Sequence, residues 1–245
     1  MSRQWMFGCC CALVAAVVMC AAVKAQAKRF SFPEAGFGLQ LPAQWVQVPG
    51  DVLRKRMESL AQAMEIDTES KRLDYDYALQ LESKEWFSYP YILISHREGL
   101  RVDSGEIQEM NERVKTSLQK EQPGVSNNEL VSAQYDPRRH EYRAETRFRM
   151  GETDMVLLKA VWYLNQDVLV ASAYLPESMY SRYAPDVLQA MDSLDITPEN
   201  VYRAEDDSGS TFWEAVLPYS KVIMATVIVL LLVGIYLWRQ RSNGS

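Results

Sequence analysis

His96 and His140 are the only histidines in this chain, and so the only imidazoles for acid–base chemistry or metal binding near neutral pH. His96 closes an alternating run with Ile92 and Ile94, whereas His140 shares a strand-like face with Tyr142. Either imidazole could act as a general base beside a carboxylate from a distant strand, or could be a structural polar residue. We favour the structural interpretation, because the sequence contains no Gly-x-Ser-x-Gly nucleophile motif.

Arginines at every second position are the next feature that could bind a ligand. Arg143, Arg147 and Arg149 project from one face of a predicted strand whose other face is apolar. They could hold an anionic partner, or they could pair with Glu141, Glu145 and acids of neighbouring strands. We expect ion pairs and keep the three arginines as a candidate interface.

Metal and cofactor sites receive little support from the sequence. Asp74 and Asp76 could share a strand face, but two carboxylates bind a cation weakly and the surrounding residues lack the pattern of a calcium loop. All four cysteines lie before residue 21, in a segment that we expect to be removed on export. We therefore predict no metal, no disulfide and no cofactor.

The loop between two predicted strands, over 75–81 and 89–96, is unusually aromatic. Trp86, Phe87, Tyr89 and Tyr91 occur where a loop would normally be polar. These side chains could insert into a groove of a partner, or Trp86 and Phe87 could fold back over the end of the sheet. This aromatic segment is our preferred candidate for a contact site.

The spacing of apolar residues predicts the elements that must position these side chains. Helical spacing predicts helices beginning at Asp51 and Ser104, and a third over 176–193. Alternation predicts an antiparallel meander with strands over 130–135, 139–150, 155–164 and 168–175. The third of these strands is almost wholly apolar, which indicates that both of its faces are covered. The fold class is therefore α+β, an antiparallel sheet with helices packed against it.

The two ends of the chain predict export and membrane anchoring. Residues 1–27 resemble a signal peptide that ends in Ala25-Gln26-Ala27, although an uncleaved signal anchor remains an alternative. Residues 216–238 predict a transmembrane helix, because 222–238 is uncharged and Arg239 and Arg241 follow it directly. A short cytoplasmic tail over 239–245 completes the predicted topology.

One domain over 28–204, joined to the membrane by an acidic linker over 205–215, lies between these ends. Five of the 26 basic residues and none of the 32 acidic residues lie in the two apolar ends, so the part between them carries a net charge of −11. This charge disfavours nucleic-acid binding and makes basic protein surfaces or cations more suitable partners.

Three stretches of the chain resemble the Mog1/PsbP-like family, which includes DcrB-type envelope proteins and the PsbP subunits of photosystem II. They are an opening segment, Gly36-Phe-Gly-Leu-Gln-Leu-Pro-Ala-Gln-Trp45, a long hairpin over 158–174, and a closing helix over 183–196 that ends in Met191-Asp-Ser-Leu-Asp-Ile. The resemblance implies an α/β/α sandwich and a role as an accessory or binding module. It transfers no functional residue to this chain.

Together these features predict a single-pass, non-catalytic accessory module of a bacterial inner membrane, with its main domain in the periplasm. Its partner would be another membrane or envelope protein, and the transmembrane helix would be a passive anchor. The alternative is a hydrolase-like envelope enzyme that uses His96 or His140 with carboxylates. A pocket that holds an imidazole beside an acid would favour the alternative.

Overall fold

The computed structural model describes residues 27–63, 75–120 and 125–203. The predicted signal peptide before Ala27, the acidic linker, the transmembrane helix and the cytoplasmic tail lie outside these residues. Within the three described ranges, no helix combines the length and the apolar character that crossing a membrane requires.

A small three-stranded sheet opens the domain. It consists of β1 (Ala27–Phe32) and β2 (Phe37–Pro42), joined by the 3₁₀ turn η1 (Pro33–Ala35), and β10 (Asp195–Ile196), which adds to the free edge of β2. Gly36 leaves that turn with a φ of 64°, a left-handed conformation that favours glycine.

A seven-stranded antiparallel sheet forms the centre of the molecule. Its strands are β3 (Trp45–Gln47), β4 (Tyr77–Leu81), β5 (Tyr91–Arg97), β6 (Val125–Asp136), β7 (Glu141–Met150), β8 (Thr153–Tyr163) and β9 (Val168–Pro176). Their spatial order is β3-β4-β5-β9-β8-β7-β6. The predicted meander from β6 to β9 is therefore confirmed, and its last strand pairs with β5 through seven residues, Tyr91 to Arg97.

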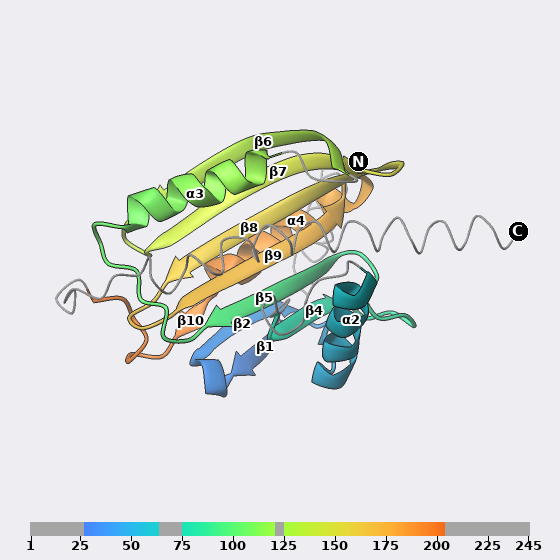
Figure 1. Ribbon diagram of the computed structural model, residues 1–245. Helices are drawn as coiled ribbons and strands as arrows, with labels where there is room; N and C mark the ends of the chain where they lie inside the picture. The colour runs from blue at the N-terminus through green and yellow to red at the C-terminus, as the bar shows by residue number, and fades with distance from the viewer. Residues whose placement is uncertain (1–26, 64–74, 121–124, 204–245) are drawn as a thin grey trace, which may run out of the picture.

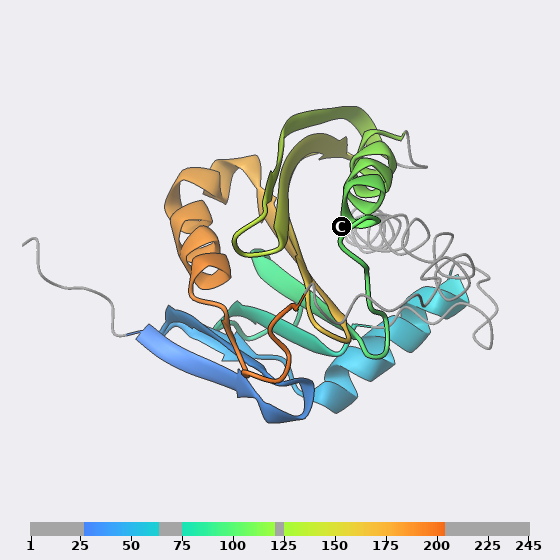
Figure 2. The same cartoon turned by 90° about the vertical axis from the view of Figure 1, so that its left-hand side faces the viewer.

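Helices cover both faces of the large sheet (Figures 1 and 2). α2 (Gly50–Ala63) and α3 (Ile107–Gln119) lie on one face, where α2 packs on β4 and α3 packs on β6 and β7. α4 (Glu177–Asp192) lies on the other face, beside the small sheet, and packs on β8, β9 and β2. The chain thus has the predicted α+β architecture, with two antiparallel sheets and three helices in the described residues.

Each face of the large sheet has its own apolar core. Met155, Leu157, Val161 and Tyr163 of β8 belong to the core under α2 and α3. The alternate residues of the same strand, Val156, Leu158, Ala160 and Trp162, belong to the core under α4 and the small sheet. The expectation that this strand is covered on both faces is confirmed.

Two predicted boundaries are wrong. The helix expected to begin at Ser104 begins at Ile107, because the carbonyl of Asp103 accepts the N–H groups of Glu106 and Ile107 in a turn that precedes α3. The strand expected from residue 139 begins at Glu141, because His140 has a φ of 47° and lies in the preceding turn. Local backbone turns decided both boundaries, and apolar periodicity does not report them.

Replacing Gly36 by alanine should destabilise the domain by about 1–3 kcal/mol, because a left-handed φ strains any residue with a Cβ atom. The added Cβ would also clash with the Asn200 side-chain amide and lie 2.9 Å from the Thr197 hydroxyl. Urea unfolding of the full chain, followed by tryptophan fluorescence, measures the change. Gly50→Ala is the matched control, since a Cβ there meets nothing within 4 Å. Equal midpoints for the two variants would contradict the strain at Gly36.

Candidate functional site

The aromatic loop between β4 and β5 is organised from beneath by Gln80. This glutamine is 0 % exposed on β4. Its Nε2 donates to the Glu85 carbonyl at 3.0 Å, and its Oε1 accepts the Phe87 N–H at 2.6 Å. Both polar groups of this buried amide form hydrogen bonds with the backbone of one loop. Moving the loop would leave those groups buried and unpaired, which costs free energy, so Gln80 fixes the loop's backbone.

Two serines tie the ends of the loop together. The hydroxyls of Ser83 and Ser88 lie 3.2 Å apart. The Ser88 hydroxyl donates to the Glu85 carbonyl at 2.9 Å, and the Ser83 hydroxyl accepts the Glu85 N–H at 3.3 Å. Phe87 adopts a positive φ of 63°, an uncommon conformation that these hydrogen bonds hold in place. The loop is therefore ordered before any partner arrives.

The four aromatic residues of the predicted contact site differ in their exposure to solvent. Trp86 is 44 % exposed, whereas Phe87 and Tyr89 are half-buried and Tyr91 is 5 % exposed. Tyr89 stacks on Tyr91 with ring centroids 5.1 Å apart, and Phe87 meets Tyr91 edge-on at 6.2 Å. The guanidinium of Arg56 on α2 lies 5.7 Å from the Phe87 ring centroid. Three of the four rings thus anchor the loop to the core, and Trp86 alone among them stands in solvent.

The expectation that Tyr91 is exposed is wrong. Tyr91 begins β5 opposite Tyr174 of β9, on the face that belongs to the core under α2 and α3. Burial raises the pKa of Tyr91 well above its ordinary value, so the phenol stays neutral. Phe87 packs against the core under α2 and α3, as one interpretation expected, whereas Trp86 is exposed and its contact with a partner stays a prediction.

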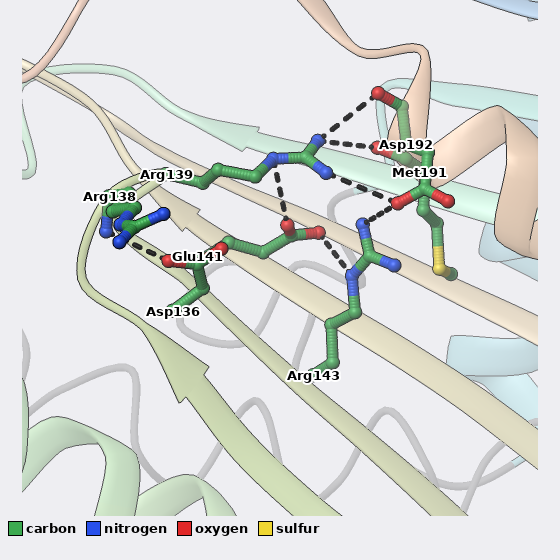
Figure 3. A network of polar contacts seen from close by, with 7 residues as sticks. All are labelled: Asp136, Arg138, Arg139, Glu141, Arg143, Met191 and Asp192. Atoms are coloured by element: carbon green, nitrogen blue, oxygen red, sulfur yellow. Dashed lines mark hydrogen bonds and ion pairs between the residues drawn. The ribbon is translucent and has the colours of Figure 1, made fainter.

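The arginines of β7 are engaged in ion pairs with acids (Figure 3). Glu141, 2 % exposed, lies between Arg139 and Arg143, with Nε–Oε distances of 3.2 and 2.6 Å. Asp192, at the end of α4, lies 3.1 Å from Nη1 of Arg139 and 2.8 Å from Nη2 of Arg143. Burial lowers the pKa of Arg143, but its hydrogen bonds to Glu141 and Asp192 outweigh that effect and raise it overall.

The two remaining arginines of the candidate interface also have partners. Arg147 lies 3.4 Å from Glu145 and 3.3 Å from Glu177 of α4. Arg149 pairs with Asp154 at the start of β8, at 2.7 Å. The ion-pair interpretation is therefore confirmed for Arg143, Arg147 and Arg149. Their partners include acids of α4 as well as of the strands, and the network joins β7 to that helix.

The two histidines have different surroundings. Nε2 of His96 lies 3.0 Å from Asp167, whose other carboxylate oxygen accepts the Gly99 N–H at 2.9 Å. The hydrogen bond to Asp167 raises the pKa of His96 above its ordinary value, despite partial burial. Nδ1 of His140 lies 3.1 Å from the Tyr135 hydroxyl, and burial lowers the pKa of this imidazole.

The His96–Asp167 pair is the imidazole beside an acid that the enzyme alternative requires. It joins the end of β5 to the turn between β8 and β9, which is a structural connection between distant segments. Across the described ranges, histidines, cysteines and carboxylates nowhere gather in a group of three or more that could hold a metal ion. A small cavity of about 10 Å³ near α4 has an almost wholly apolar lining that includes Phe37, Trp162 and Met191.

Two residues with specialised environments were missed by the sequence reasoning. Gln80 organises the aromatic loop, but a lone glutamine in an alternating strand carries no recognisable signal. Lys159 is 6 % exposed in the middle of β8. It is the only charged residue in the run from Met155 to Leu164, and that interruption of an apolar strand was a signal that could have found it.

No protein-family model matches the sequence, and no curated protein matches it. Similar solved structures include CyanoP, a PsbP protein of Synechocystis sp. PCC 6803, with 13 % identity, a TM-score of 0.42, and coverage of 71 % of this chain and 95 % of that one. LpqN, involved in cell envelope biogenesis of Mycobacterium tuberculosis, has 11 % identity, a TM-score of 0.43, and coverage of 71 % and 91 %.

A third match is PA94 of Pseudomonas aeruginosa, a protein of unknown function, with 11 % identity, a TM-score of 0.36, and coverage of 71 % of this chain and 99 % of that one. The structural neighbours thus include a PsbP protein, the type of protein that the sequence resembles.

Replacing Glu141 by glutamine should destabilise the domain by about 3 kcal/mol, because it removes the buried carboxylate between Arg139 and Arg143 and leaves Asp192 as the one acid that pairs with both arginines. The measurement is the urea midpoint of the full chain at pH 7. Asp154→Asn, which removes an acid from an exposed pair, is the control and should leave the midpoint unchanged. A Glu141→Gln midpoint equal to that of the control would show that the network contributes nothing to stability.

The two imidazoles should titrate on opposite sides of the ordinary histidine value of 6.5, with His96 above it and His140 below it. NMR titration measures both, because the chain has two histidines. Since the folded state holds the His96 proton more tightly than the unfolded state, this contribution to stability is fully present below pH 6.5 and is lost as the pH rises through the folded pKa.

The stability difference between the native chain and His96→Gln should accordingly shrink as the pH rises above neutral. His140→Gln serves as the control, because its lowered pKa has the opposite sign. A difference that grows with pH for His96→Gln would contradict the ion pair with Asp167.

Proposed function

We propose that this chain is a non-catalytic binding or accessory module, held at the periplasmic face of a bacterial inner membrane by its C-terminal helix. The observation that carries the proposal is the ordered loop that holds Trp86 in solvent on a buried support. The signal-like N-terminus, the apolar segment over 216–238 and the acidic charge support the location and the membrane attachment.

An exposed tryptophan on a rigid loop is suited to binding a protein. Tryptophan is enriched among the interface residues that contribute most to affinity, since its large apolar surface is desolvated on contact. A loop that is already ordered loses little conformational entropy when it binds. Gln80, Ser83 and Ser88 provide that order here, so the free energy gained by burying Trp86 is largely retained as affinity.

The charge around the loop indicates the nature of the partner. Glu82, Lys84 and Glu85 are exposed beside Trp86 and sum to a net negative charge, and the whole region between the apolar ends is acidic. A partner with an apolar groove and a basic rim would complement this surface. Attachment to the same bilayer would raise the effective concentration of such a partner, so that modest affinity would suffice.

The test begins with the intact chain, solubilised in mild detergent from its native membrane, and with the stoichiometric protein that co-purifies with it. Trp86→Ala should weaken affinity for that protein at least tenfold, since it removes the central apolar contact. Gln80→Leu leaves Trp86 in place but removes the loop's support, and should also weaken binding. Leu188→Ala, at an exposed apolar residue of α4, is the matched control.

Full binding by Trp86→Ala would overturn the role of the loop. An unchanged urea midpoint for Trp86→Ala is expected, because the side chain is largely exposed. If no protein co-purifies at stoichiometric amounts in any detergent, the accessory role itself loses its support.

A further inference from the structure

Lys159 occupies the centre of a buried sheet face. It lies on β8 opposite Ala144 of β7 and Ser172 of β9, and it is 6 % exposed. Alternation along β8 places it on the same face as Leu157 and Val161, which belong to the core under α2 and α3. A lysine in such a position is rare unless an acid compensates it.

No such acid compensates Lys159 in the described part of the chain. Burial alone lowers its pKa to about 8, and no charged group among the described residues contributes to the shift. The side chain therefore still carries its proton at pH 7. Buried charges that lack a counterion are costly, so a lysine retained here calls for a ligand or a catalytic role.

Three hydroxyl groups of β5 and β7 on the same face also lack partners within the described residues. The side-chain oxygens of Ser95, Tyr142 and Thr146 are buried and make no hydrogen bond within the described residues. Tyr142 pairs with Val161, and Thr146 pairs with Leu157, the residues two positions on either side of Lys159. Ser95 of β5 pairs with Val170 of β9, which in turn pairs with Val161. These donors therefore flank the lysine on both sides along the strands.

The two helices on this face pack at its ends. α2 packs on β4 and α3 packs on β6 and β7, so β5, β9 and β8 lie between them (Figure 2). The unpartnered hydroxyls and Lys159 come from β5, β7 and β8. Polar groups from three strands thus lie along one face of the sheet.

The composition of this face defines the chemistry that it would recognise. One ammonium group compensates one negative charge, and a dianion would bring a second, uncompensated charge into a buried site. Hydroxyl donors suit carboxylate oxygens. Leu93, Leu157 and Val161 on the same face suit an apolar body.

We propose that this face binds a monocarboxylate with an apolar body, the chemical class of a fatty acid, and that Lys159 is its cationic partner with Thr146, Tyr142 and Ser95 as hydrogen-bond donors. This site goes beyond the proposed contact role of the Trp86 loop and does not depend on it. Lys159→Met should therefore leave binding of the co-purifying protein intact.

Octanoate is the probe, titrated by calorimetry into the full chain in a maltoside detergent at pH 7. Octanol, which has the same apolar chain without the charge, is the ligand control. Octyl phosphate, which can carry two negative charges on the same chain, tests whether the site accepts a dianion. Lys159→Met keeps the length of the side chain but removes the charge, and should weaken octanoate binding at least tenfold. Lys55→Met, at an exposed lysine of α2, is the matched protein control.

A second readout separates a ligand site from a purely structural lysine. Lys159→Met should raise the thermal midpoint of the ligand-free chain by about 5 °C, because it removes an uncompensated buried charge. A fall in the midpoint would show that Lys159 stabilises the fold and would contradict the site. Thr146→Val, which deletes one hydroxyl at nearly constant shape, should weaken octanoate binding about threefold. This variant still tests the site if Lys159→Met fails to fold.

Several results would overturn the proposal. Octanoate binding that is equal in the native chain and Lys159→Met would exclude the lysine as the partner. Octanol that binds as tightly as octanoate would show an apolar site without charge recognition. Octyl phosphate that binds more tightly than octanoate would exclude the assignment to a monocarboxylate.

Discussion

Strand β8 is buried along both faces from Met155 to Tyr163, and every other layer of the domain follows from the need to cover it. Its alternate side chains enter two separate apolar cores. One core requires α4 and the small sheet, and the other requires α2 and α3 (Figure 2). Because apolar burial is the main favourable contribution to folding, removing either cover would expose half of a central strand.

Polar groups next to these cores are mostly compensated. Glu141 meets Arg139 and Arg143, the Tyr163 hydroxyl donates to Asn111 at 2.7 Å, and Gln80 bonds the loop above it. The Tyr163–Asn111 contact joins β8 to α3, and the Gln80 contact joins β4 to the loop that follows it. Lys159 differs because its charge has no counterpart among the described residues, which is why it points to a ligand.

The two proposed sites use different physical means. The Trp86 loop lies outside the core and obtains its order from hydrogen bonds beneath it, so a protein surface can reach it. The Lys159 face is inside the sheet layer, where a low dielectric makes a single charge effective for recognition. A surface contact and a buried ligand site can coexist in one accessory module, because they use different elements.

The alternation of apolar residues determined the strands from β6 to β9, the coverage of β8 and the closing helix, since side-chain period is a local property of the backbone. The two outer segments of the chain were also predicted from local composition alone. The period of β7 placed its arginines on one face, and their pairing with acids could be anticipated from charge alone. Glu141 and Glu145 were among the expected partners, whereas the two acids of α4, Asp192 and Glu177, could not be identified from the sequence.

Only the tertiary structure decided which distant residues meet. Asp192 reaches Arg139 because α4 crosses the sheet, and His96 reaches Asp167 because β9 pairs with β5. The same pairing buries Tyr91 and leaves Trp86 in solvent, although both residues belong to one aromatic run. Sequence spacing specifies which way a side chain points on its own strand, whereas the order of strands in the sheet specifies what it meets there.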